Sequence, residues 1–453
     1  MFKVKKVLAI AVAIALVSVF LFTGCGANKS SENNTEQSKS TQAASESKAT
    51  ESTKESNEPV TLRFAAPEGP FKGEIEAFAE GFKNVSPNTT VQYEPLAGNW
   101  EEKLLTQISS GTAADVFWVP DVRTPVFASK GALLELDQYF SKFNVDKEDI
   151  FPAMLATGMY NGKVYMIPRD YNHIVTFYNK VLFQKAGVAF PKNGWTWQEF
   201  VDTATKLTVK DGKTFTQRGC DASLLWQATA IPMILGLGGS ITDPYPAGTA
   251  AAFDTPGTIS ALKEIKTLVD SGVLVNNVTN DVGDIFGGKV AMAFHVRPIA
   301  STMNDKIGVG NWDVVTFPAL PAKHVVGSGA SGYSVYSGSK VPDEAAKLVF
   351  YIISEAGQEV FMKTGNSISV RKSLISNELW RSMPTKDHNQ DAYIDQPEFD
   401  VPPLALTLAD PEVGMLDFDA AWINALTALL NGEKSPEEAA KYGQSELANL
   451  FKK

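Results

Sequence analysis

In this 453-residue chain, the residue types that most often bind metals or act as nucleophiles do not form a metal-binding or catalytic motif. No His-Glu-x-x-His motif and no closely spaced cysteine pair is present, so the sequence gives no support for a metal site, and we expect no cofactor. No Gly-x-Ser-x-Gly elbow occurs either. The four histidines stand far apart in the chain: His173, His295, His324 and His388.

Two glycine-rich stretches fit nucleotide-binding patterns but lack the elements that such loops need. Residues 327–332 match the dinucleotide pattern, yet residues 333–336 predict a strand where a helix N-terminus is required. Residues 283–289 fit a phosphate loop, yet Val290 stands where a magnesium-binding hydroxyl is needed. We therefore expect no nucleotide site.

Carboxylates could support hydrolytic chemistry. Exported carbohydrate hydrolases use two acids that flank the scissile bond, and neighbouring acids such as Asp417 and Asp419 are present. Because most acids in any chain are solvated, their abundance does not establish an enzyme, and a hydrolase stays open as an alternative to a binding protein. In a structural or adhesion protein we would expect internal repeats, and the sequence contains none.

Two other acids follow predicted strands. Alternating apolar residues predict strands at 60–64, 91–93 and 115–119, and apolar residues at helical spacing predict helices between them. This order is typical of a parallel sheet. Because ligands bind at the carboxyl ends of strands in such sheets, Glu68 and Asp121 are candidate ligand contacts. A solvated loop acid is an equally good interpretation of Glu68.

Residues 162–187 are the stretch around which the chain is organised. A turn at Asn161-Gly162 precedes a short predicted strand that ends at Pro168, and the polar segment 169–173 follows. A second apolar run, 174–178, then leads into a short helix. This order suits a chain that passes between two lobes, and it also suits a surface loop between two strands of one sheet.

Motifs in this stretch and beyond it resemble, in order, those of the bacterial extracellular solute-binding proteins of sugar type, the family that includes maltose-binding protein. The resemblance spans most of the chain after residue 58. Phe294 to Arg297 depart from it, because relatives often have Gly and Trp there, and this departure favours a more polar ligand. The matching motifs are Gly162-Lys163, Tyr165, Pro168, Tyr178-Asn179-Lys180, Leu182-Phe183, Ala186-Gly187, 196–200, 114–118 with Asp121, 253–256, 284–292, 314–321, 365–371 and 430–439.

The resemblance implies an α/β fold with two lobes, each a mixed sheet flanked by helices, and a ligand cleft between them. The chain would cross between the lobes three times, near 168–173, 318–327 and 371–395. The N-terminal lobe would comprise residues 59–168 and 327–375, and the C-terminal lobe residues 169–326 and 376–453.

The implied function is that of a monomeric receptor that captures a carbohydrate by hinge closure and delivers it to the permease of an ABC importer. A non-sugar polar solute remains an alternative. Aromatic faces would cover the sugar ring while charged and amide groups bind its hydroxyls. Core packing is the alternative role for the aromatic candidates, and surface exposure for the polar ones. The predicted aromatic contacts are Trp118, Trp226 and Tyr333, and the polar ones are Glu68, Asp121, Arg169, Asn172, His295, Arg297, Arg371 and Asp417, with Asp121 corresponding to the family's ligand-contacting aspartate.

The N-terminus predicts export. Three lysines precede residues 7–22, whose only polar member is Ser18, as in a secretory signal. Gly24-Cys25 resembles a lipoprotein processing box, so residues 1–24 would be removed and Cys25 would carry lipid. Residues 26–58 lack large apolar side chains, which predicts a flexible tether over 25–58. We expect a protein anchored to the outer face of the cytoplasmic membrane.

Charge and cysteine content limit the partners further. The formal net charge of −10 argues against nucleic acid and against electrostatic docking on an anionic membrane. With lipid on Cys25, Cys220 has no partner for a disulfide, so an extensive hydrophobic core must supply the stability.

Overall fold

The computed structural model describes residues 58–69, 71–245, 248–365, 367–383, 387–403, 413 and 415–452, all within one folded unit. The predicted signal peptide, Cys25 and the tether up to residue 57 lie outside these ranges. Among the described residues, no helix combines the length and the apolarity that a membrane span requires.

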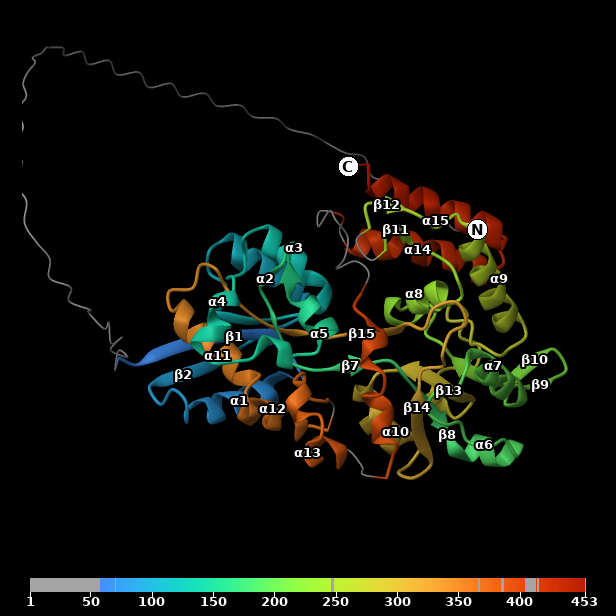
Figure 1. Ribbon diagram of the computed structural model, residues 1–453, viewed down its shortest axis with the longest axis horizontal. Helices are drawn as coiled ribbons and strands as arrows, with labels where there is room; N and C mark the ends of the chain where they lie inside the picture. The colour runs from blue at the N-terminus through green and yellow to red at the C-terminus, as the bar shows by residue number, and fades with distance from the viewer. Residues whose placement is uncertain are drawn as a thin grey trace, which may run out of the picture. The chain divides into compact units, whose positions relative to one another are not determined.

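The first five-stranded sheet has the strand order β2-β1-β3-β16-β6 (Figure 1). Parallel pairing joins β1 to β2 and to β3, as the strand–helix–strand pattern predicts, whereas β16 is antiparallel to both β3 and β6. The helix α1 (Phe71–Phe82) buries Ile75, Phe78 and Phe82, which are three of the residues at helical spacing. The strands are β1 (Val60–Pro67), β2 (Thr89–Leu96), β3 (Val116–Val119), β16 (Gly332–Val335) and β6 (Ile167–Pro168).

The second five-stranded sheet has the order β14-β8-β13-β10-β9 and is also mixed, because β13 is parallel to β10 and antiparallel to β8. All five residues of β8 are buried, and its two polar side chains, Thr176 and Asn179, are hydrogen-bonded. The prediction of a mixed α/β fold is therefore confirmed. The strands are β14 (Trp312–Thr316), β8 (Val175–Asn179), β13 (Val290–His295), β10 (Thr214–Asp221) and β9 (Val209–Asp211).

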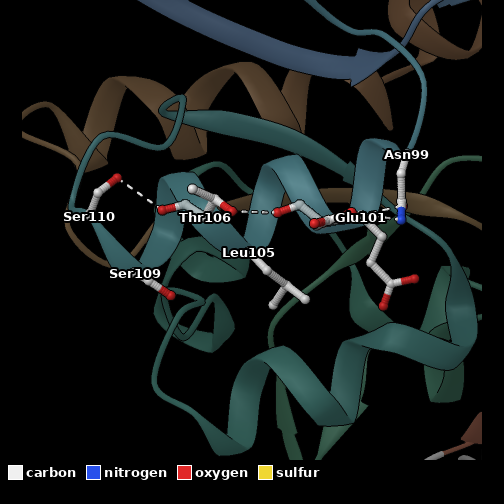
Figure 2. Close-up of a pocket in the computed structure, with 7 residues that line it drawn as sticks. Asn99, Glu101, Leu105, Thr106, Ser109 and Ser110 are labelled. Atoms are coloured by element: carbon white, nitrogen blue, oxygen red, sulfur yellow. Dashed lines mark hydrogen bonds between the residues drawn. The ribbon is translucent and has the colours of Figure 1, made fainter. Parts of the chain in front are cut away.

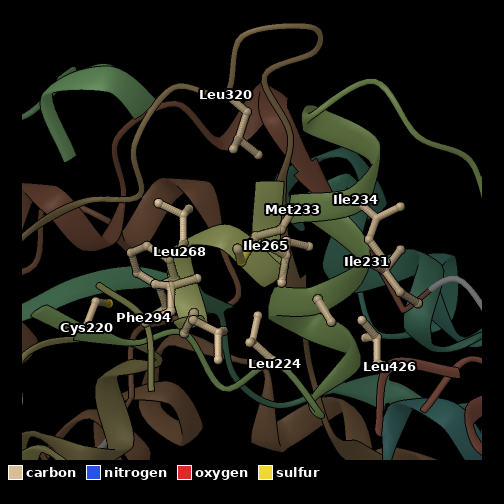
Figure 3. Close-up of a cluster of buried hydrophobic side chains, with 14 of the residues drawn as sticks. Cys220, Leu224, Ile231, Met233, Ile234, Ile265, Leu268, Phe294, Leu320 and Leu426 are labelled. Carbon is tan, nitrogen blue, oxygen red and sulfur yellow. The ribbon is translucent and has the colours of Figure 1, made fainter. Parts of the chain in front are cut away.

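A large apolar core covers one face of the second sheet (Figure 3). Cys220 of β10 and Phe294 of β13 lie in the same cluster as residues of α8 (Gln227–Gly236) and α9 (Pro256–Asp270). The helix α14 (Met415–Leu430) adds Leu426. Burial raises the pKa of the Cys220 thiol well above its ordinary value, so this cysteine is a packed apolar residue.

Three chain passages between the two sheets meet in a third sheet, which we call the crossing sheet. Its strands are β17 (Asp400–Val401), β15 (Val326–Gly329) and β7 (Asn172–His173), in that order. Along the chain, β7 lies between β6 and β8, and β15 lies between β14 and β16. Figure 1 shows β7 and β15 side by side. Residues 327–329, expected to form a glycine-rich loop, are a strand instead because β15 pairs on both sides. The third passage pairs at 400–401, beyond the predicted 371–395.

Buried polar side chains join the first and third passages, and we call Tyr171, His173 and Asp400 the crossing triad. The Tyr171 hydroxyl donates to Asp400 Oδ2 at 2.7 Å, and His173 Nδ1 lies 2.6 Å from Asp400 Oδ1. The His173 and Asp400 side chains are only 2% and 1% exposed. The triad therefore holds two remote segments together without any contact to solvent.

The remaining elements surround these sheets. Several helices begin at side-chain caps, for example the capping box of Thr196 and Glu199 at the start of α7. The other elements are α2 (Trp100–Ser109), α3 (Thr124–Ser129), α4 (Asp137–Lys142), α5 (Pro152–Thr157), α6 (Lys180–Ala186), α7 (Trp197–Lys206), α10 (Ala300–Lys306), α11 (Pro342–Ile352), α12 (Glu355–Met362), α13 (Glu378–Arg381), α15 (Pro436–Leu450), β4 (Met159–Tyr160), β5 (Lys163–Val164), β11 (Thr242–Asp243) and β12 (Ala250–Ala251).

Candidate ligand pocket at the crossing sheet

A pocket of about 390 Å³ lies against the crossing sheet. The exit of β3 contributes residues from the first sheet, and the exit of β13 contributes residues from the second sheet. The start of α8 and the turn after β15 complete the wall. The lining residues are Asp121, Val122, Asn172, Ile174, Trp226, Gln227, Ala228, Val296, Pro298, 327–331 and Pro403.

Asp121 is a half-buried carboxylate in this wall. The Val122 backbone N–H donates to its Oδ1 at 2.8 Å. A Cβ atom on Gly329 would lie 2.5 Å from Asp121 Oδ2, so glycine at this position lets the carboxylate approach the backbone of β15. Burial, and then repulsion by Asp170 and Asp419, raises the pKa of Asp121 to about 7. Asp121 can thus change its charge near neutral pH.

Asn172 lies beside a second acid. Its side-chain amide and the Ser331 backbone N–H both donate to Asp170, whose pKa is raised mainly by burial. Asn172 Oδ1 and Asp170 Oδ1 are buried and accept no hydrogen bond from any described residue. An unsatisfied buried acceptor costs about 1–3 kcal/mol, so Asn172 Oδ1, whose residue lines the pocket, is suited to receive a donor from a solute, whereas Asp170 is not among the lining residues.

Trp226 supplies an aromatic surface to the same pocket. It is half-buried immediately before α8, and its ring centroid lies 5.4 Å from that of His295. His295 does not line the pocket directly. Its Nδ1 accepts from the Val296 backbone N–H at 2.9 Å, and burial lowers its pKa. His295 is therefore neutral at neutral pH and supports the tryptophan ring.

Tyr333 and Arg169 lie outside the pocket. Tyr333 is fully buried against Phe64, with ring centroids 4.8 Å apart, and its hydroxyl contacts Glu74 and Arg169. Arg169 Nη1 pairs with Glu74 Oε1 at 2.6 Å. These side chains form a buried network beneath the first sheet, so the geometry places them in the scaffold instead of on the predicted ligand surface.

Arg297 is also internal. It is 1% exposed and donates to Gln390 Oε1 and to the Trp380 carbonyl, both at 2.6 Å, as well as to the Met383 carbonyl. The Trp380 and Tyr393 rings lie 5.1 and 4.9 Å from its guanidinium carbon. This side chain fastens the segment around 380–393 to the end of β13, next to pocket residues Val296 and Pro298.

The remaining predicted contacts are separate from the pocket. Arg371 pairs with Asp149 at 2.7 Å, and Glu68 and Asp417 are exposed. Trp118 is half-buried between two aromatic rings, with centroid distances of 5.0 Å to Phe71 and 5.1 Å to Trp100. Its indole Nε1 is buried and has no acceptor among the described residues.

A wider depression of about 720 Å³ lies on α2. Figure 2 shows its lining side chains along one helix face, where Thr106 and Ser110 hydroxyls donate to backbone carbonyls of the same helix. Glu101 in this face is already paired with Arg123 at 2.9 Å. Because a single exposed helix face forms the lining, the depression cannot enclose a solute, and the smaller pocket is the better candidate.

Sequence reasoning missed part of the pocket wall, namely Gln227, Pro403 and the backbone of 327–331. The glycine and serine content of 327–332 was a usable signal, because small residues permit close approach of a backbone to a ligand. In the described part of the chain, no group of three or more potential metal ligands comes together.

Comparisons with known proteins agree with this architecture. The solved ABC substrate-binding protein of Listeria monocytogenes in complex with cycloalternan superposes with a TM-score of 0.70 at 22% identity, over 87% of this chain and 99% of that one. A cyclo/maltodextrin-binding protein complexed with maltotetraose gives 0.69 at 19% identity, over 88% and 98%. These likenesses establish the shared two-lobed fold.

Sequence relatives extend the comparison. A putative binding protein of Brucella abortus is 24% identical over 328 residues, covering 69% of this chain and 75% of the relative. The sn-glycerol-3-phosphate-binding periplasmic protein of Yersinia pestis is 29% identical over 147 residues, 31% of this chain and 33% of its own length. The family model described as bacterial extracellular solute-binding protein matches residues 65–359. With this match over more than half of its length, the chain belongs to the bacterial extracellular solute-binding protein family.

Proposed function

We propose that this solute-binding protein captures a carbohydrate and delivers it to the permease of an ABC importer. The observation that carries the proposal is the composition of the pocket wall, where the Trp226 ring stands with the acceptors Asp121 and Asn172. A sugar offers an apolar ring face and many hydroxyl donors, which suit these two kinds of surface. The sugars in the solved complexes of similar proteins support the same class of solute.

Capture would proceed by closure at the crossing sheet. Asp121 follows a strand of the first sheet, whereas Trp226 and Val296 belong to the part of the chain that holds the second sheet. A rotation about the three short strands would bring these groups onto one solute and exclude water from it. The proposed lobes are 59–168 with 327–375, and 169–326 with 376–453.

We further propose binding without turnover. The similar solved proteins are described as a substrate-binding protein and a cyclo/maltodextrin-binding protein, which supports a binding role for this chain. Incubation with candidate oligosaccharides, followed by mass analysis, should return the solute unchanged. Shortened products that form at catalytic rates would support the hydrolase alternative.

The proposed location is the outer face of the cytoplasmic membrane, through lipid on Cys25 and the tether 25–58. The basic and apolar N-terminus with Gly24-Cys25 supports this location. The protein would act as a monomer. Cys25→Ala should release the protein from the membrane fraction or leave it unprocessed. Membrane attachment that persists after signal cleavage would contradict lipid anchoring.

The main experiment is a thermal-shift screen with mono- and oligosaccharides, followed by calorimetric titration of each hit. A sugar at one hundred times its dissociation constant should stabilise the fold by about 2.7 kcal/mol. Trp226→Ala should weaken binding about tenfold or more, beyond any loss of stability from its contact with the apolar core. Phe190→Ala, which removes an aromatic side chain that is 40% exposed and outside the pocket, is the control. Equal affinities of the two variants would refute the proposed site.

A further inference from the structure

The charge around the pocket points to a narrower class of solute. Asp121 is the only ionisable residue in the described pocket wall. Asp170 and Asp419 both lie close enough to repel its charge. A solute that enters this pocket therefore meets negative potential, and no cation belongs to the described part of the wall.

The arginines near Asp170 and Asp419 are shared with other carboxylates. Arg169 already faces two carboxylates, Glu74 at 2.6 Å and Asp170 at 3.8 Å. On the other side, Arg123 is paired with Glu101 at 2.9 Å. Burial raises the pKa of Asp419 to about 6, although the charge of Arg123 opposes this rise. Two guanidinium groups thus lie near four carboxylates, and Asp121 adds a fifth carboxylate that has no arginine of its own among the described residues. Closure around a neutral solute would leave Asp121 either protonated or buried as an unpaired charge, and the unpaired charge is costly.

The hydrogen-bonding groups are biased in the same direction. Asp170 Oδ1 and Asn172 Oδ1 are buried acceptors without a donor in the described residues, and Asp121 Oδ2 faces the backbone of Gly329. A protonated amine brings both positive charge and several N–H donors. The Trp226 ring adds a face that attracts cations.

We infer that the solute carries a basic nitrogen, as an amino sugar does, and that Asp121 is the residue that selects for it. This inference rests on the proposed carbohydrate function and makes it more specific. It also disfavours anionic solutes such as sugar phosphates, which the same acids would repel.

The pH dependence of binding follows from the groups that face Asp121. These are Asp170 in the first passage, Asp419 on α14, and the paired Arg169 and Arg123 behind them. With its pKa raised to about 7, Asp121 is protonated below that pH and ionised above it. Affinity for an amine should therefore fall up to about tenfold per pH unit between pH 7 and pH 5, with proton release on binding. A neutral sugar should show no such fall.

The test uses two matched series on the whole protein: glucosamine with glucose and N-acetylglucosamine, and the glucosamine β-1,4-disaccharide with cellobiose. Calorimetric titration should show that the amines bind at least about tenfold more tightly than their neutral partners. Asp121→Asn should cost the amines about 100-fold and the neutral sugars less than about tenfold. The control is Asp202→Asn, which removes an exposed acid of α7. Melting curves of both variants should match that of the parent protein.

The failure of this inference is distinguishable from the failure of the proposed function. Neutral sugars that bind as well as the amines, or an Asp121→Asn variant that weakens both series equally, would overturn the inference and leave carbohydrate capture intact. Absence of binding by both series would overturn the inference, and only the absence of any hit in the wider sugar screen would overturn carbohydrate capture as well.

Discussion

A substitution of the buried Arg297 tests whether this side chain stabilises the fold, as its position indicates, or binds the ligand, as the sequence predicts. Arg297→Met removes a guanidinium that serves three acceptors, on Gln390, Trp380 and Met383. At about 2 kcal/mol for each hydrogen bond to the charged guanidinium that is lost, the loss is about 6 kcal/mol.

A compensating gain comes from the cost of burying the charge. Burial lowers the pKa of Arg297 from 12.5 to about 10, so the charged form is less favourable in the folded state at neutral pH. This shift corresponds to roughly 3 kcal/mol, which methionine would recover. The net destabilisation should therefore be about 3 kcal/mol.

The assay is urea unfolding followed by tryptophan fluorescence, beside calorimetric titration of the solute. Arg381→Met is a matched control, because Arg381 lies over the same Trp380 ring but is 25% exposed and pairs with Asp391. The control should cost less than about 1 kcal/mol. Unchanged stability of Arg297→Met together with lost affinity would refute the reasoning and return Arg297 to the ligand surface.

Three further variants test other parts of the molecule. Asp400→Asn should destabilise the fold by about 2–4 kcal/mol in urea unfolding, because the crossing triad loses its charged acceptor, and a loss under about 0.5 kcal/mol would contradict its structural role. Gly329→Ala should weaken solute binding about tenfold by displacing Asp121, whose Oδ2 would lie 2.5 Å from the new Cβ; calorimetry with unchanged affinity would place Asp121 outside the site. Cys220→Ser should lower the melting temperature, with a loss of about 1–3 kcal/mol in the free energy of unfolding, and leave affinity unchanged. A variant as stable as the wild-type protein would contradict the apolar packing described for this thiol.

The elements of the first sheet could be predicted from periodicity alone. Apolar residues at 60–64 and 71–82 alternate first by two and then by three or four, and β1 and α1 form there with those residues buried. Local patterns suffice to predict a helix or strand when one of its faces is buried and the other is exposed to solvent. The strand at 326–329 escaped prediction because its pairing partners, β7 and β17, are remote in sequence.

The candidate site was only partly predictable for the same reason. Asp121 follows a strand and Trp226 precedes a helix, two positions that can be recognised from the local sequence. Both residues line the pocket. Tyr333 belongs to a strand whose four residues are all buried, so alternation could not indicate its direction. The burial of Arg297 depends on short helices near 380–393, whose contacts with β13 no local pattern specifies.

The position of β16 in the first sheet has a consequence for folding. This strand lies between β3 and β6, yet it follows every strand of the second sheet in the chain. The pairing edge of β3 thus stays open until residues 332–335 have been synthesised, and the sheet cannot close on a nascent chain that ends earlier. Such non-local pairing slows folding. Late closure gives a polypeptide destined for export time to reach a translocation machinery while it is still unfolded.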